Sequence, residues 1–214
     1  MPKLSRKLTP TPCSHFFTTQ IELTRLKAAT PKFLRELKTE ISQIQSIDRK
    51  GVLWSKAHYP AGYTSYASFS NLHETSPSFA RLKLEIDRHV QKFAAKLDME
   101  LTGHSIWMNS CWVNVMPPNA HHSSHLHPLS FISGTFYVDV PQGSAPLKFE
   151  DPRLASMMYA PPKRANAKAE NQTFISFEPE PGNLILFESY LRHEVPSQQA
   201  KGQRISVSFN YSWS

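Results

Sequence analysis

Two histidines that lie two residues apart, His125 and His127, are the side chains of this sequence best placed to do chemistry together. Residues at positions i and i+2 of an extended segment point to the same side, so both imidazoles can converge on one ion. A third histidine, His193, follows much later in the chain. Imidazole binds iron, zinc, copper or nickel. The pattern predicts a metal site with two ligands on one segment and a third on a distant one.

A second histidine pair, His121 and His122, lies just upstream and is an alternative source of ligands. Adjacent residues of a strand point to opposite faces, so this pair is less suited to share an ion. A histidine taken alone is more often a surface residue or a hydrogen-bonded core residue than a ligand. The combination of His125, His127 and His193 is what favours metal binding.

Arg204 opens a run in which polar and apolar residues alternate up to Phe209. The alternation predicts a strand on which Arg204 and Ser206 point to the same side, into a barrel. A buried arginine needs a partner, and a guanidinium pairs with a carboxylate through two parallel hydrogen bonds. This arrangement suits the far end of a dicarboxylic keto acid. The alternative is an arginine at a strand edge, paired with a surface acid such as Glu194.

The N-terminal half contains the signals of two helices. Thr30 and Ser76 are good N-caps, each is followed by proline, and apolar residues then recur at helical spacing. We expect both helices to brace the outside of a barrel. Gly51 is predicted to end the first helix. Residues 52–75 are predicted to form a long loop whose aromatic side chains cap the core, with a substrate lid as the alternative.

From about residue 104 the apolar residues recur with a period of two. Strands are predicted at 106–115, 131–140, 147–149, 173–177, 183–187, from Val195 onward, and at 205–211. The segment 152–171 is predicted to be an exposed loop or flap. Several short strands with no helix between them predict an antiparallel sandwich or barrel. The chain is therefore predicted to be one mainly β domain, 1–214, with a helical and loop part (1–103) and a β core (104–214).

Composition excludes several classes of protein. No apolar run is long enough to cross a membrane. Two cysteines, Cys13 and Cys111, are too few for a disulfide framework and predict reduced thiols in the cytoplasm. The chain has 24 Lys and Arg against 17 Asp and Glu, a net charge of +7, and these residues are scattered. That distribution favours a solvated basic surface over a nucleic-acid groove.

Six motifs occur together in the C-terminal half: 125–130, 133–138, 149–153, 181–187, His193 and 204–210. With this set, the chain resembles the 2-oxoglutarate- and iron(II)-dependent oxygenase superfamily. More narrowly, it is similar to a family of bacterial and phage oxygenases. The likeness extends into the N-terminal half and so covers most of the chain.

The resemblance implies a double-stranded β-helix, or jelly-roll, fold. It implies Fe(II), 2-oxoglutarate and O2 as the reactive partners, with decarboxylation of the keto acid to succinate and hydroxylation of a small molecule, amino acid or peptide. It assigns His125, His127 and His193 to the metal, and Arg204, Ser206, Tyr137 and Asn114 to 2-oxoglutarate.

The sequence departs from the usual pattern of this superfamily at one ligand. The usual iron site has two histidines and one carboxylate, and the acid stands at the position of His127. A histidine there removes a negative charge and should make bound iron a stronger Lewis acid. Three alternatives follow: a site that works with three histidines, an acid such as Glu150 or Asp151 that joins from elsewhere, or a different metal.

Two other functions fit parts of the pattern. A cupin-type dioxygenase also uses a His-x-His pair with a later histidine, but it has no need of Arg204 and Ser206. A non-catalytic jelly roll that binds metal or nucleic acid is the third hypothesis. The nucleic-acid repair branch of the superfamily carries a further arginine where this chain has Asn210, so a nucleic-acid substrate is not expected. The sequence leaves the substrate and a homodimeric state open.

Overall fold

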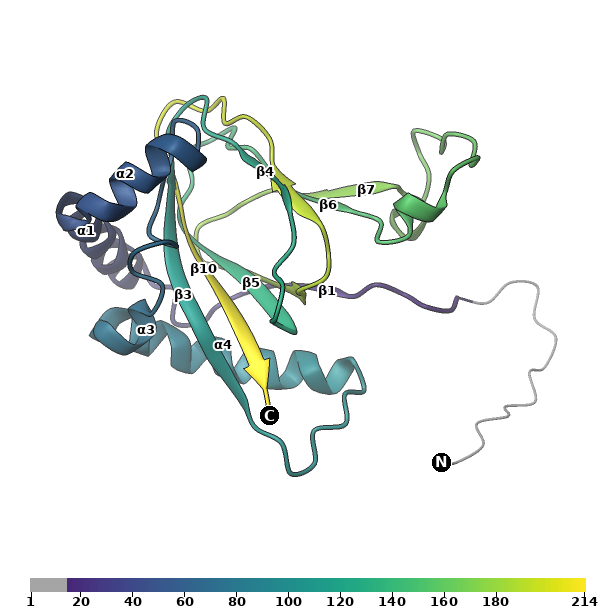
Figure 1. Ribbon diagram of the computed structural model, residues 1–214, viewed down its shortest axis with the longest axis horizontal. Helices are drawn as coiled ribbons and strands as arrows, with labels where there is room; N and C mark the ends of the chain where they lie inside the picture. Colours follow the sequence, from purple (N-terminus) through teal and green to yellow (C-terminus); the bar gives the residue numbers. More distant parts are fainter. Residues whose placement is uncertain (1–14) are drawn as a thin grey trace.

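Two antiparallel sheets face each other in the computed structural model, which describes residues 15–214 (Figure 1). The six-stranded sheet has the order β1-β8-β5-β10-β3-β2, and the four-stranded sheet has the order β4-β9-β6-β7. We refer to them as the major and the minor sheet. This architecture confirms the prediction of a mainly β jelly roll. Cys111 is a buried free thiol, and Cys13 lies outside the described residues.

The strands are β1 (Ile21–Arg25), β2 (Tyr63–Thr64), β3 (Ile106–Met116), β4 (His122–His125), β5 (Ile132–Asp139), β6 (Leu147–Glu150), β7 (Phe174–Phe177), β8 (Asn183–Glu188), β9 (His193–Val195) and β10 (Arg204–Trp213). The helices are α1 (Pro31–Ile47), α2 (Arg49–His58), α3 (Leu72–Thr75) and α4 (Pro77–Lys96). Strand β9 ends at Val195, where the sequence predicted a strand to begin. Strands β1, β2 and β4 were not predicted, because they are short and β4 is entirely polar.

Strand β10 lies in the middle of the major sheet, between β3 and β5, and is buried on both faces from Arg204 to Tyr211. Its odd-numbered residues from Ile205 to Tyr211 belong to the hydrophobic cluster beneath the helices. Its even-numbered residues from Arg204 to Asn210 are polar and point to the other side, toward the minor sheet. The strict alternation therefore places a row of polar side chains inside the barrel.

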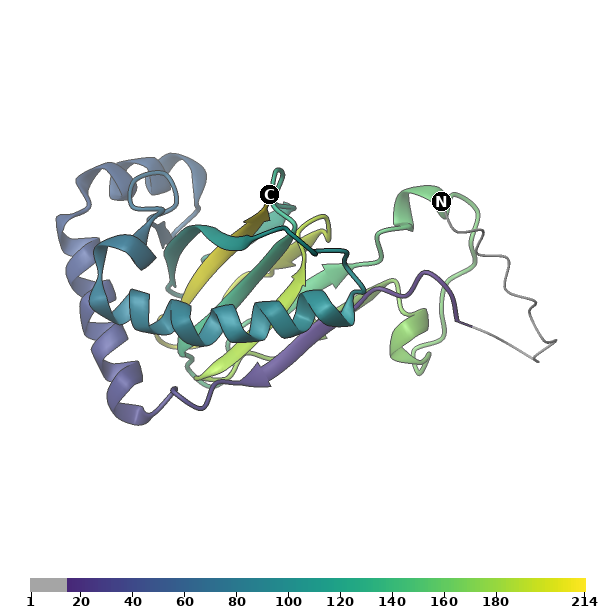
Figure 2. The ribbon, with the colours of Figure 1, turned by 90° about the horizontal axis from the view of Figure 1, so that it is seen from below.

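Helices α1 and α4 pack on the outer face of the major sheet, as predicted, and Figure 2 shows α4 crossing it. Thr30 Oγ1 accepts a hydrogen bond from the Phe33 amide at 3.2 Å, which caps α1. Ser76 Oγ accepts one from the Phe79 amide at 3.4 Å, which caps α4. Apolar residues at helical spacing on both helices are buried against the sheet. Because both helices cover the outer face of the major sheet, its inner face can contribute side chains to a functional site.

The prediction of a loop over residues 52–75 was wrong. Helix α1 ends at Ile47, and α2 begins directly after Asp48 and runs on to His58. Gly51 does not end a helix but lies in the first turn of α2. A Cβ atom there would lie 1.9 Å from Asp48 Oδ2 and 2.6 Å from Ser68 Oγ. A glycine is needed here because no larger side chain fits against Asp48 and Ser68. The expectation that Gly51 ends a helix was therefore wrong.

Asp48 ties α2 to the segment that follows it. It is 3 % exposed, its Oδ1 accepts from the Gly51 amide at 2.8 Å, and its Oδ2 accepts from Tyr63 Oη at 2.8 Å and from Ser68 Oγ. We expect Asp48→Ala to lower the free energy of unfolding by about 2–4 kcal/mol, because two buried donors and the half-buried Ser68 hydroxyl lose their acceptor. Urea denaturation measures this. Glu36→Ala, at an exposed site, should change it by less than about 0.5 kcal/mol; an equal loss in both variants would contradict the prediction.

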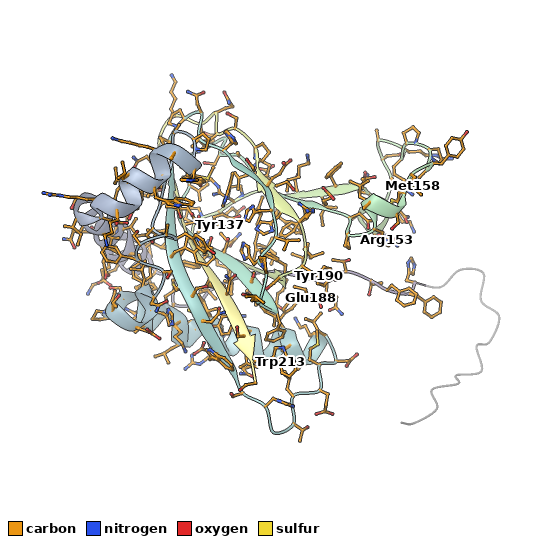
Figure 3. All side chains as sticks on the ribbon, in the orientation of Figure 1. Tyr137, Arg153, Met158, Glu188, Tyr190 and Trp213 are labelled. Carbon is orange, nitrogen blue, oxygen red and sulfur yellow. The ribbon has the colours of Figure 1, made fainter. Side chains whose placement is uncertain are left out.

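The segment 152–171 is mostly exposed, as predicted, and contains two short 3-10 turns. It lies at the tip of β6 and β7, which project from the barrel (Figure 1). Figure 3 shows Arg153 and Met158 on this projection, far from Tyr137 in the barrel. No residue of the segment lines the two cavities beside the histidines that are described below. No helix within residues 15–214 has the length and apolar character needed to cross a membrane.

Candidate active site

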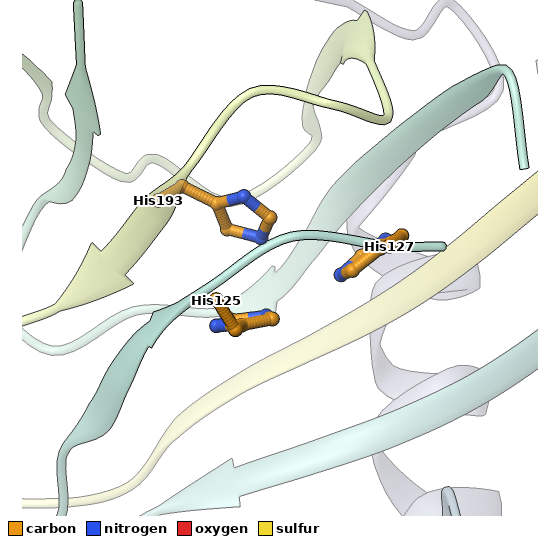
Figure 4. Close-up of side chains that lie close together, drawn as sticks. All are labelled: His125, His127 and His193. Carbon is orange, nitrogen blue, oxygen red and sulfur yellow. The ribbon is translucent and has the colours of Figure 1, made fainter. Parts of the chain in front are cut away.

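Three histidines meet inside the barrel, at one end of the minor sheet (Figure 4). His125 is the last residue of β4, His127 follows two residues later, and His193 begins β9. Strands β4 and β9 are paired so that His125 lies opposite His193. One ring nitrogen from each histidine lies within 4.8 Å of those from the other two. We call this group the histidine cluster; it is the only potential metal-binding group of this kind among the described residues.

Backbone carbonyl groups set the ring orientation of two members of the cluster. His125 Nδ1 lies 2.8 Å from the Ser123 carbonyl oxygen, and His193 Nδ1 lies 2.9 Å from the Leu191 carbonyl oxygen. A carbonyl oxygen only accepts, so each Nδ1 carries the hydrogen and donates it. Each Nε2 then keeps a free lone pair, which is the form that binds a metal.

Side chains of the major sheet hold the third ring. His127 Nδ1 lies 2.7 Å from Asn210 Oδ1 and 2.8 Å from Ser133 Oγ. Ser133 Oγ in turn donates to Asn210 Oδ1 at 2.8 Å. The backbone amide of His127 donates to the Ser189 carbonyl at 3.0 Å. Sequence reasoning did not give Asn210 this supporting role, although it shares the alternation of Arg204 along β10.

The histidine cluster is electrically neutral at neutral pH. Burial, together with the neighbouring His125, lowers the pKa of His127 to about 4. Burial also lowers the pKa of His193 to about 2 and reduces the pKa of His125. Because a metal binds the unprotonated imidazole, these three rings are ready to act as ligands.

The depressed pKa values predict that the metal-free protein loses stability as the pH falls. Below about pH 6.5 the unfolded chain binds protons at these histidines, whereas the folded protein does not. Each such histidine then lowers the free energy of unfolding by up to about 1.4 kcal/mol per pH unit. We expect the Tm to fall between about pH 7 and pH 5, and less steeply in His193→Asn. A Tm that is constant over this range would contradict the prediction.

Among residues 15–214 no carboxylate joins the histidine cluster, so an acid ligand from Glu150 or Asp151 finds no support. Asp151 is engaged by Arg153, with Nε 2.9 Å from Oδ1 and Nη2 2.8 Å from Oδ2. Both acids line a separate cavity on the side of the projecting segment. Within the described part of the chain, the donor set of the cluster is three imidazoles.

His122 lies beside the cluster without belonging to it. Its ring stacks on that of His125, with centroids 4.1 Å apart and planes inclined by 26°. Burial lowers its pKa to about 3. His121, the other member of the alternative pair, is not part of the cluster either. The structure therefore brings together the three histidines that the spacing favoured.

Arg204 points into the barrel and has no acidic partner within residues 15–214. Its Nη1 donates to Met116 Sδ at 3.3 Å and its Nη2 donates to Tyr137 Oη at 3.4 Å, while Nε has no partner. The alternative of a pair with Glu194 is wrong, because Glu194 binds Lys148 at 2.8 Å. A guanidinium that is 2 % exposed and lacks an anion is costly unless a ligand supplies one.

One cavity connects Arg204 with the histidine cluster, and we call it the Arg204 cavity. Ser206 and Asn114 also line it, whereas Tyr137 lies beneath the guanidinium and is not part of its wall. Three of its wall residues carry buried polar atoms without a partner: Arg204 Nε, Asn114 Oδ1 and Tyr59 Oη. Burial raises the pKa of Tyr59, so its hydroxyl stays a donor. The chemistry of the wall thus suits a small polar anion next to a metal ion.

Residues 110–210 match the model of a family described as "Putative 2OG-Fe(II) oxygenase". No curated protein matches the chain.

Solved structures share the fold. A prolyl-4-hydroxylase from Pseudomonas putida matches with a TM-score of 0.57 and 15% identity, over 91% of this chain and 93% of that one. HygX from Streptomyces hygroscopicus, with nickel and 2-oxoglutarate bound, matches with a TM-score of 0.60 and 14% identity, over 91% and 83%. The α-ketoglutarate-dependent epimerase SnoN of nogalamycin biosynthesis matches with a TM-score of 0.60 and 11% identity, over 91% and 79%.

Proposed function

Because residues 110–210 match the model of a family described as "Putative 2OG-Fe(II) oxygenase", we propose that the chain is a 2-oxoglutarate- and iron(II)-dependent oxygenase that hydroxylates a small molecule, amino acid or peptide. The co-substrates are 2-oxoglutarate and O2. One oxygen atom enters a C–H bond of the substrate, and the other enters succinate as the keto acid loses CO2. The metal ligands in this proposal are His125, His127 and His193.

The observation that carries the proposal is Arg204, a buried cation without an anion in the same cavity as the histidine cluster. A dicarboxylate can satisfy the guanidinium at one end and reach the metal at the other. Ser206 and Tyr59 offer hydroxyl groups in the same wall. A cupin-type site or a non-catalytic metal site gives no reason to bury an unpaired arginine.

The net positive charge expected at this site favours the binding of a dianion. Three neutral imidazoles leave the full charge of a divalent metal uncompensated, and Arg204 adds one further positive charge. The dianion 2-oxoglutarate offsets these charges inside the barrel, where electrostatic interactions are strong. When bound, iron(II) together with 2-oxoglutarate supplies the two-electron oxidation of the substrate. Asn210 and Ser133 keep the His127 ring oriented throughout.

The three-histidine ligand set is part of the proposal. It replaces the usual carboxylate by a neutral ligand, which makes the bound metal a stronger Lewis acid. Solved structures of the same fold include hydroxylases and an epimerase, so hydroxylation itself rests on this proposal. A metal other than iron is the second candidate, which metal analysis of the purified protein tests.

The deciding experiment is an anaerobic titration of the metal-free protein with Fe(II) and then 2-oxoglutarate. We expect the weak visible charge-transfer band of a keto acid chelated to iron. Admission of O2 should then give one succinate for each 2-oxoglutarate consumed. Metal binding with neither band nor succinate would overturn the proposal and favour a cupin-like or non-catalytic metal site.

A further inference from the structure

A second cavity lies beside the Arg204 cavity and shares wall residues of the histidine cluster with it. Four aromatic side chains line it: Trp54, Tyr59, Tyr66 and Trp112. Its volume is about 180 Å³. We call it the aromatic pocket. Trp54, Tyr59 and Tyr66 belong to residues 52–75, for which the sequence left a substrate lid as an alternative, and Trp112 belongs to β3.

The aromatic side chains of the pocket pack against one another and against neighbouring histidines. Trp54 stacks on His58, with ring centroids 4.6 Å apart and planes inclined by 16°. Tyr66 meets Trp112 edge to face at 5.1 Å, and Trp112 meets His127 in the same manner at 5.8 Å. Packed rings of this kind form a preorganised surface for another ring. Trp112 contacts the histidine cluster directly, so a ligand on this surface lies next to the metal site.

No Asp, Glu, Lys or Arg of the described chain lines the aromatic pocket. Two of its polar side chains are engaged, since Asn210 Oδ1 lies 2.7 Å from His127 Nδ1 and Thr64 Oγ1 accepts from the Tyr66 amide at 3.3 Å. The Tyr59 hydroxyl in the same wall has no partner among the described residues and is uncharged. An anionic group would therefore lack a cation here. An ammonium group would lack a carboxylate and would lie near the charge of Arg204 in the adjoining cavity.

We propose that the aromatic pocket receives the substrate and selects an uncharged ring about the size of one amino-acid side chain. A dry cavity of about 150 Å³ is large enough for benzene, so the available volume suits one such ring. The ring serves recognition, and the C–H bond to be oxidised lies on its side facing the histidine cluster. The inference rests on the proposed function, because it takes the histidine cluster as the reacting centre.

The test uses three small probes that share a ring and differ in charge: benzyl alcohol, benzoate and benzylammonium. The full-length protein is labelled with 5-fluorotryptophan and followed by fluorine NMR without metal or 2-oxoglutarate. Trp54 and Trp112 line the pocket, whereas Trp107 and Trp213, the other two tryptophans, are 41% and 53% exposed elsewhere. Single Trp→Phe variants assign the four resonances.

We expect benzyl alcohol to shift the Trp54 and Trp112 resonances saturably, with a Kd of about 1–10 mM for so small a ligand. The Trp107 and Trp213 resonances should not move. Both charged probes should bind at least about tenfold more weakly at the pocket tryptophans. Equal or tighter binding of benzylammonium would overturn the inference in favour of a cation cage. Equal shifts at all four tryptophans, or none with benzyl alcohol, would also overturn it.

Two variants on α2 test whether the Trp54 side chain contributes to ring binding. Trp54→Ala should weaken benzyl alcohol binding about threefold to tenfold, read from the Trp112 resonance. Leu53→Ala removes an exposed neighbour on the same helix and should leave the Kd unchanged. Unchanged Trp107 and Trp213 resonances verify that each variant is folded. Equal Kd values for both variants would overturn the role of the Trp54 wall.

The outcome separates this inference from the proposed function. Ring binding is measured without iron or 2-oxoglutarate, so it does not depend on the chemistry. Succinate formation in a protein that binds none of the rings overturns the pocket inference and supports the oxygenase. Ring binding in a protein that forms neither the band nor succinate overturns the oxygenase and, with it, the role of the pocket as a substrate site.

Discussion

Replacement of Arg204 by methionine is expected to abolish 2-oxoglutarate binding while it leaves metal binding intact. Methionine keeps most of the side-chain volume and removes the charge. Loss of a buried charge pair costs about 3–5 kcal/mol, so the affinity for 2-oxoglutarate should fall by at least about a hundredfold. The measurement is the charge-transfer band in an anaerobic titration, together with the affinity of the metal alone.

Arg204→Met should also affect the Tm of the metal-free protein in a way that is not expected for an arginine with a purely structural role. In the wild type without 2-oxoglutarate, Arg204 is a buried cation without an anionic partner in the described structure. Its removal should therefore leave the Tm of the metal-free protein unchanged or raise it. Arg204→Lys should restore binding only in part, since an ammonium cannot make the parallel pair of hydrogen bonds. A large fall in Tm with unchanged 2-oxoglutarate affinity would contradict the assignment.

Lys148 provides the matched control. It is a cation on the minor sheet that pairs with Glu194 at 2.8 Å, and it does not line the Arg204 cavity. Lys148→Met should leave the charge-transfer band at its wild-type intensity. A comparable loss in this variant would show that the general positive charge of the barrel, rather than Arg204, attracts the keto acid.

The second large effect is expected at His127. His127→Ala removes one of three ligands and should weaken Fe(II) or Zn(II) binding by at least about a hundredfold, because even supporting residues of such sites contribute tenfold or more. His127→Asp restores the usual two-histidine, one-carboxylate set and should retain the metal. Competition with a chelator measures the affinity, and the rise of Tm on addition of Zn(II) gives an independent value.

His121→Ala is the control for this series. His121 lies in the neighbouring pair but outside the histidine cluster, so its loss should leave metal affinity within about twofold. An equal loss of affinity in His121→Ala and His127→Ala would contradict the assigned ligand set. A complete loss in His127→Asp would show that the site depends on a neutral ligand hydrogen-bonded to Asn210.

Local periodicity was enough to predict much of the scaffold. The caps at Thr30 and Ser76 gave the starts of α1 and α4, because N-capping depends on neighbouring residues only. Period-two alternation predicted that Arg204 and Ser206 point inward together, since successive strand residues face opposite sides. Local signals failed around Gly51, which was expected to end a helix. Gly51 instead lies in the first turn of α2, where its amide donates to Oδ1 of the N-cap residue Asp48.

The sequence by itself determined which residue types the site could use: a His-x-His pair, a late histidine and an arginine on an alternating strand. Only the tertiary structure decided which of them meet. The pairing of β4 with β9 sets His193 opposite His125, and the course of the chain keeps Glu150 and Asp151 in a different cavity. It also leaves Arg204 without an anion from residues 15–214 and brings aromatic side chains of residues 54–66 and β3 together in one pocket. These relations depend on strand register between distant segments, which no local pattern encodes.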